Sequence, residues 1–166
     1  MMGSVVGVSR FRLMLPTLIC FALIGAQAAY YWGQIPETVH TNGHQSKELF
    51  FGFEAFMVFV TTGLFSLIAS RLPTVKPELF NLPNKQYWLA PERAKRTVKF
   101  IQRRVWMMSA VVGLFTVLIS QLVLDTNLKG HPLDQGSIVG LVIVFAVVIA
   151  GFTISMGIRF TRVPKF

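Results

Sequence analysis

"VWMMSAVVGLFTVLISQLVL", residues 105–124, is a run of 20 uncharged residues between Arg104 and Asp125. An α-helix rises 1.5 Å per residue, so about 20 apolar residues cover the ~30 Å hydrocarbon layer of a bilayer. The stretch therefore predicts a membrane-spanning helix. Its flanks differ in charge, because arginines precede it and an aspartate follows it. The other apolar runs also have more positive charge at one end than at the other.

Three further apolar windows flank this run. Residues 13–36 and 135–158 each hold 24 uncharged residues, and residues 49–70 are interrupted by a single charge, Glu54. Backbone groups in lipid must bond within their own segment, and no alternating barrel pattern is present, so helices are expected. We predict an all-α integral membrane protein, an antiparallel bundle of four transmembrane helices at about 12–33, 49–70, 105–124 and 136–158.

The composition of the 166-residue chain favours a single membrane domain over residues 1–166. Hydrophobic residues make up 53% and charged residues 14%, whereas soluble domains carry about a quarter charged residues. Small residues four apart, such as Gly136 and Gly140, favour helix packing in the last span and leave a homo-oligomer open.

The first window also resembles a secretory signal peptide. Arg10 and Arg12 precede an apolar run that ends in the small-x-small pattern Ala26-Gln27-Ala28. The run continues, however, into Tyr30, Tyr31 and Trp32, which is typical of an interfacial anchor that closes a full span. We expect the segment to be retained as a helix.

Fourteen of the 16 lysines and arginines lie before the first span, between the second and third, or after the fourth. Lys47 and Lys129 fall on the opposite side. The positive-inside rule therefore predicts cytoplasmic termini, a cytoplasmic connector at 71–104, and outer loops at 34–48 and 125–135.

The connector ends in "NKQYWLAPERAKRTVKFIQRRVW", residues 84–106. Pro91 suits the first turn of a helix, so we expect a basic juxtamembrane helix that leads into the third span. Each cation near an anionic leaflet contributes about 1 kcal/mol of attraction, and aromatic rings favour the headgroup layer. The expected lipid-binding or partner-binding residues are Tyr87, Trp88, Arg93, Arg96, Lys99, Arg103 and Arg104. Nucleic-acid binding is not expected, because the net charge of +9 lies where topology alone would place it.

A polar layer is predicted near the outer surface, centred on Glu54. Gln27, Gln121 and Ser137 lie at similar depths on the other three spans. Above the layer, the loop "IPETVHTNGHQSKE", residues 35–48, supplies further candidate binding residues: His40, Asn42, His44 and Lys47. The layer could bind a ligand or a proton, or Glu54 could simply be hydrogen-bonded inside the bundle with the histidines solvated. The spacing is not diagnostic of a metal site, and we predict neither a metal nor a cofactor.

The outer loop and the connector resemble a known group of proteins. Ile35-Pro36, Val39-His40, Asn42-Gly43 and Ser46-Lys47 are similar to the loop motif of small bacterial membrane proteins grouped as domain of unknown function 1648, although the piece between the histidine and the Ser-Lys pair is shortened here. "NLPNKQYWLAPER", residues 81–93, is also similar to a stretch in that group. The resemblance implies a bacterial inner-membrane protein, whose better-known relatives confer immunity to a toxin or take part in signalling. It points to Pro36, His40, Asn42, Gly43, Ser46 and Lys47 in the loop, and to Asn84, Tyr87, Trp88, Pro91, Glu92 and Arg93 in the connector.

The sequence shows no phosphate loop, metal-binding cysteine pair or nucleophile elbow, so no enzyme is predicted. We expect a protein that acts by binding, receiving a peptide, toxin or partner at its outer end. Two alternatives stay open at this point. One is an accessory subunit of a larger membrane complex; the other is a small proton-linked transporter that uses Glu54.

Overall fold

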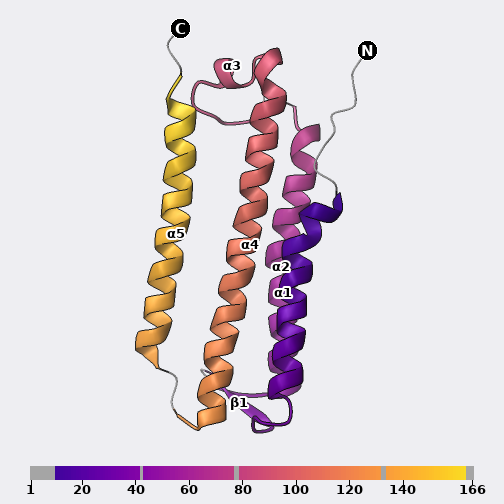
Figure 1. The fold of residues 1–166 in the computed structure, drawn as a ribbon, viewed down its shortest axis with the longest axis vertical. Helices are drawn as coiled ribbons and strands as arrows, with labels where there is room; N and C mark the ends of the chain where they lie inside the picture. The colour runs from indigo at the N-terminus through magenta and orange to yellow at the C-terminus, as the bar shows by residue number, and fades with distance from the viewer. Residues whose placement is uncertain (1–9, 42, 77–78, 132–133, 164–166) are drawn as a thin grey trace.

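The structure is a computed structural model, and it describes residues 10–41, 43–76, 79–131 and 134–163 (Figure 1). The elements in chain order are α1 (Arg10–Tyr31), β1 (Thr38–His40), β2 (His44–Ser46), α2 (Lys47–Arg71), the 3-10 turn η1 (Leu72–Thr74), α3 (Lys85–Trp88), α4 (Pro91–Lys129) and α5 (Gln135–Thr161). Four of these helices are long and apolar enough to cross a membrane. The predicted helical class is confirmed, with four helices that could span a membrane.

Local sequence signals set the helix ends. The side chain of Ser46 caps α2 by accepting from Leu49 N at 3.3 Å, and Asp134 caps α5 by accepting from the backbone of Gly136 and Ser137. Pro91 opens α4, and Gly130 closes it in the left-handed conformation that glycine adopts without strain.

α4 is one helix of 39 residues, about 58 Å long. The predicted juxtamembrane helix and third span are therefore continuous. Two predicted boundaries were wrong. α4 runs on to Lys129, so Asp125 lies on a helix and not in a loop, and the outer loop 34–48 holds a two-stranded hairpin before α2 begins at Lys47.

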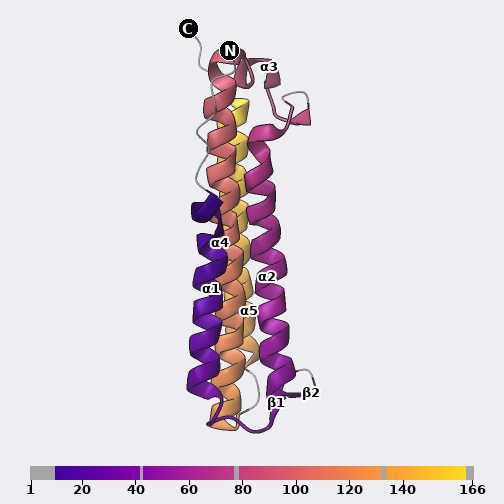
Figure 2. The ribbon, with the colours of Figure 1, turned by 90° about the vertical axis from the view of Figure 1, so that its right-hand side faces the viewer.

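α1, α2 and α4 pack against one another, and their connections alternate between the two ends of the molecule (Figures 1 and 2). α5 packs mainly along α4, and Phe160 is the one residue of that helix that is buried. The core thus belongs to three helices with a fourth beside them, rather than to the expected bundle of four. Apolar side chains of the three helices fill it, among them Cys20, Ile24, Val58, Val117 and Leu124.

Small polar side chains join the three helices through backbone carbonyls. Ser66 Oγ donates to Leu13 O at 2.8 Å, and Ser109 Oγ donates to Thr62 O at 3.2 Å. In lipid, close packing and such bonds hold helices together, because the hydrocarbon is as apolar as the side chains. Of the described glycines, Gly113 is the most tightly packed: an added Cβ would lie 2.6 Å from Cys20 Sγ and 2.7 Å from Thr62 Cγ2.

The predicted small-residue contact on the last helix is not found. A Cβ at Gly140 would meet nothing within 4 Å, and Gly136 lies beside its own helix cap, Asp134. α2 presents an apolar surface, since Phe53, Phe56 and Phe59 are more than half exposed.

We expect Gly113→Ala to destabilise the protein by about 1–3 kcal/mol, because the new methyl group overlaps two short side chains of α1 and α2. Gly140→Ala is the matched control, and it should be neutral or slightly stabilising because alanine favours a helix. Thermal unfolding of both variants in detergent tests this. Equal stability of the two variants would contradict the close approach at Gly113.

Candidate functional site

The hairpin of β1 and β2 is fixed to the end of the helices. Val39 is fully buried, and its two neighbours in β1 point outward. The side chain of Asn127, on α4, bonds both backbone groups of His40 as a neighbouring strand would. His40 N donates to Asn127 Oδ1 at 2.7 Å, and Asn127 Nδ2 donates to His40 O at 3.0 Å. The hairpin is therefore an ordered cap on the bundle and not a solvated loop.

Lys47, at the start of α2, fastens the base of this cap. Its Nζ lies 2.9 Å from Glu37 Oε1, donates to Trp32 O at 3.4 Å, and sits 5.1 Å from the centre of the Trp32 ring. The lysine side chain is 10% exposed and that of Glu37 is 82% exposed. Lys47 thus stabilises the hairpin, and Glu37 is the partner that faces solvent.

The two histidines of the loop are brought together at the surface. His40 and His44 are cross-strand partners with ring centres 4.4 Å apart, and both are exposed. Asn42, the other candidate in this loop, lies outside the described residues. Within the part of the chain that is described, no three His, Cys, Asp or Glu side chains are grouped so that they could hold a metal ion.

Beneath the hairpin, α1 and α4 share a polar cluster of four side chains. Gln27 Nε2 donates to Gln121 Oε1 at 2.9 Å and to Val117 O at 3.1 Å. Gln121 Nε2 donates to Tyr31 Oη and to Asp125 Oδ1, and the Tyr31 hydroxyl donates to the same carboxylate oxygen. A groove of about 340 Å³ opens beside the cluster between the two helices.

Glu54, on α2, is 9% exposed. Glu54 Oε2 and the hydroxyl of Ser120 on α4 both lack a hydrogen-bond partner in the described structure. Gln27 Oε1 is similarly unpaired. Of the residues predicted to form the layer, Gln27 and Gln121 are hydrogen-bonded to each other, and the hydrogen bonds of the cluster centre on Gln121 and not on Glu54.

Ser137 does not join this layer. It belongs to the cap of α5, where its hydroxyl donates to Asp134 at 2.5 Å, and these bonds hold the pKa of the Asp134 carboxyl below its usual value. Tyr31, Asp125 and Asn127 were not among the predicted site residues. A signal for the first two exists in the sequence, since Tyr31 and Asp125 each follow a glutamine of the cluster by four residues, one helical turn.

At the other end of the molecule, the connector is hydrogen-bonded to the last turn of α5. Asn84 Nδ2 donates to Phe160 O and Thr161 O, both at 3.1 Å, and Trp88 Nε1 donates to Phe160 O at 2.9 Å. The last carbonyls of a helix have no partner within it. The connector therefore supplies an external cap, and the Trp88 ring packs against Phe160 as well.

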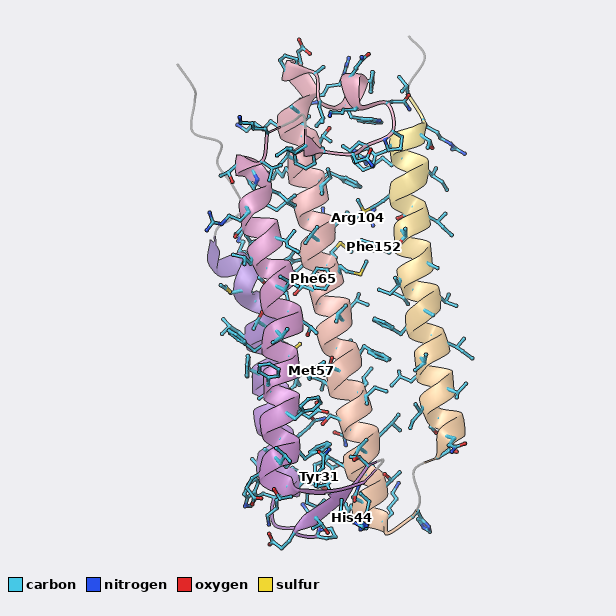
Figure 3. The ribbon with its side chains drawn as sticks, turned by 180° about the vertical axis from the view of Figure 1, so that it is seen from behind. Tyr31, His44, Met57, Phe65, Arg104 and Phe152 are labelled. Atoms are coloured by element: carbon cyan, nitrogen blue, oxygen red, sulfur yellow. The ribbon has the colours of Figure 1, made fainter. Side chains whose placement is uncertain are left out.

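The predicted basic residues of this end fall into two groups. Arg93 stacks on Tyr87 at 4.1 Å, and Arg104 lies 5.1 Å and 5.0 Å from the rings of Phe100 and Phe152. Figure 3 shows Arg104 and Phe152 at the level where α4 and α5 face each other, and Tyr31 and His44 near the opposite end. By contrast, Arg96, Lys99 and Arg103 are exposed on α4.

Comparison of the chain with protein-family models, with curated proteins and with solved structures found no match. The family resemblance of the loop and connector therefore stays a prediction.

We expect Asn127→Ala to release the hairpin, because the variant leaves the N–H and carbonyl of His40 without their partner. The loss should be about 1–3 kcal/mol and should appear as faster hydrogen exchange over residues 38–46 in detergent. Thr126→Val is the control, since that hydroxyl bonds within its own helix. Unchanged exchange in Asn127→Ala would refute the capping role of the amide.

We expect Trp88→Phe to loosen the end of α5 while keeping a ring against Phe160, because only the indole N–H is lost. A neutral hydrogen bond contributes about 1 kcal/mol, so trypsin should cut after Arg159 and Arg162 several times faster. Trp32→Phe, the same change at the far end, should leave these cleavage rates as they are. Equal rates in the two variants would show that the indole bond does not cap α5.

Proposed function

We propose that the protein is a multi-pass protein of the bacterial inner membrane with antiparallel spans and cytoplasmic termini, and that it acts by binding, without catalysis. Its outer end would receive a basic segment of a peptide or protein. The four apolar helices and the one-sided distribution of lysine and arginine support the topology.

The observation that carries the binding role is the anchoring of the hairpin to the helices. Its inner side is committed to the bundle through Val39 and the Asn127 bonds, so its outer side is a preorganised surface with two exposed imidazoles. Binding to a preformed surface avoids the entropy cost of ordering a loop. A chain that needed only a connection between α1 and α2 would not need this side chain to backbone anchoring.

Charge indicates the class of partner. The outer segments carry four carboxylates, Glu37, Glu48, Asp125 and Asp134, against the two lysines Lys47 and Lys129, although the whole chain has a net charge of +9. Complementary potentials favour association with a partner of opposite sign. An acidic, histidine-bearing outer end therefore suits a basic partner.

A second candidate, the accessory subunit of a membrane complex, is favoured by α5. None of its apolar window is buried within the described chain, and Val147 is 66% exposed. A helix of another subunit could cover this face. The proton-linked alternative has less support, because no charged side chain of the described residues is a partner of Glu54.

In-cell photocrosslinking separates the first two candidates. Thr38 points outward from β1 on the same side as His40, so a photoreactive residue at position 38 should yield a discrete protein adduct. The adduct should fall at least several-fold in the double variant His40→Gln/His44→Gln. The matched probe replaces Val147 on α5. Adducts from position 147 with none from position 38 would favour the accessory role and contradict ours.

The topology is checked in the same cells. In a Cys20→Ala background, Gln45→Cys should react with an impermeant maleimide in intact cells, and Lys95→Cys only after permeabilisation. Labelling of both positions from one side would overturn the proposed orientation.

A further inference from the structure

A separate pocket lies at the basic end of the molecule, between α1 and α4. It has a volume of about 350 Å³ and a largely apolar wall that includes Leu13, Leu15 and Trp106. Its rim carries three cations, Arg12, Lys99 and Arg103. An apolar hollow bordered by one sign of charge is the arrangement that an amphipathic anion requires.

These three cations have no counter-charge within the described chain. The ion pair formed there is that of Lys47 and Glu37, at the opposite end. Arg93, Arg104 and Arg159 instead stack on aromatic rings at 3.9 to 5.1 Å, whereas no such contact involves the rim cations. The rim cations are therefore available to an external anion.

The positions of these residues suit cations at the headgroup layer and an apolar wall in the hydrocarbon layer. Trp106 Nε1 donates to Arg12 O at 2.7 Å, which holds the start of α1 against α4. Lys99 and Arg103 are four residues apart, about 6 Å along one face of α4. Arg12 directly precedes the apolar window 13–36, and Arg103 and Lys99 lie two and six residues before the window 105–124. The rim therefore falls where headgroups meet acyl chains.

We propose that this pocket binds one anionic phospholipid of the cytoplasmic leaflet. The phosphate would contact Arg12, Lys99 and Arg103, and the first part of an acyl chain would lie along Leu13, Leu15 and the Trp106 ring. The proposal shares the membrane topology of the proposed function but is independent of binding at the hairpin. A neighbouring groove between α1 and α2 is bordered by a single cation, Arg71, and lacks this charge cluster.

The test uses the delipidated full chain in dodecyl maltoside. Dioleoyl phosphatidylglycerol is titrated against dioleoyl phosphatidylcholine, which has the same acyl chains and no net charge, while native mass spectrometry counts bound lipid. We expect one tight phosphatidylglycerol site that also raises the unfolding temperature. Lys99→Gln/Arg103→Gln should weaken it roughly 25-fold, about fivefold for each cation removed.

Two further variants keep the result decisive. Lys76→Gln/Arg162→Gln removes two exposed cations outside the pocket and should leave the affinity unchanged, and Leu15→Phe should weaken binding by filling the pocket without a change of charge. Equal weakening in both double variants would mean diffuse attraction and would overturn the site. So would equal binding of the two lipids, or the same stabilisation by millimolar inorganic phosphate alone.

Discussion

The structure depends on how three helices satisfy polar groups where no water reaches them. Leaving a buried donor or acceptor unpaired costs more than a typical hydrogen bond contributes, so the contacts between the helices are stabilised where serines and glutamines bond across them. Ser120 Oγ is an exception without such a partner. Ser66 and Ser109 reach carbonyls of neighbouring helices, and Gln102 Nε2 donates to Ala69 O at 2.9 Å. Gly113 permits the close approach that makes such short bridges possible.

The same solution recurs at both ends of the molecule with longer side chains. An amide, Asn127, closes the hairpin at one end, and another amide, Asn84, works with Trp88 to close α5 at the other. In each case a side chain from a distant part of the chain takes the place of a missing backbone partner. The residues that looked most like binding groups in the sequence are therefore partly structural, Lys47 and Trp88 above all.

Much of the fold is readable from the sequence, because the length of an apolar run and the placement of charges are one-dimensional properties. The four helices and the continuation of the basic segment into the third span follow from them. The position of α5 does not, since burial depends on which helix faces touch, and the Gly136 and Gly140 spacing occurs equally well on an unpacked helix. Partners of Glu54 were misjudged for a similar reason: depth along a helix is countable, but rotation about its axis is not.

The same distinction holds for the candidate site: the depth of a residue along its helix can be counted from the sequence, but the direction of its side chain cannot. Gln27 and Gln121 were correctly placed together because both lie about one turn below the outer boundary. Asn127 was missed because nothing near it in the chain signals that residue 40, on a separate strand, will approach. Long-range pairings of this kind are decided by the shape of the assembled bundle.

The length of α4 has a mechanical consequence. About 58 Å of continuous helix exceeds a hydrocarbon layer of ~30 Å by nearly as much again, so this one rod carries Asn127 near one end and Lys99 toward the other. A stiff rod that pivots near its middle moves its two ends in opposite directions, by about 2.5 Å for a 5° rotation over a half-length of about 29 Å. Because Asn127 binds the hairpin and Lys99 belongs to the basic rim, such a rotation of α4 would displace both ends of the molecule at once.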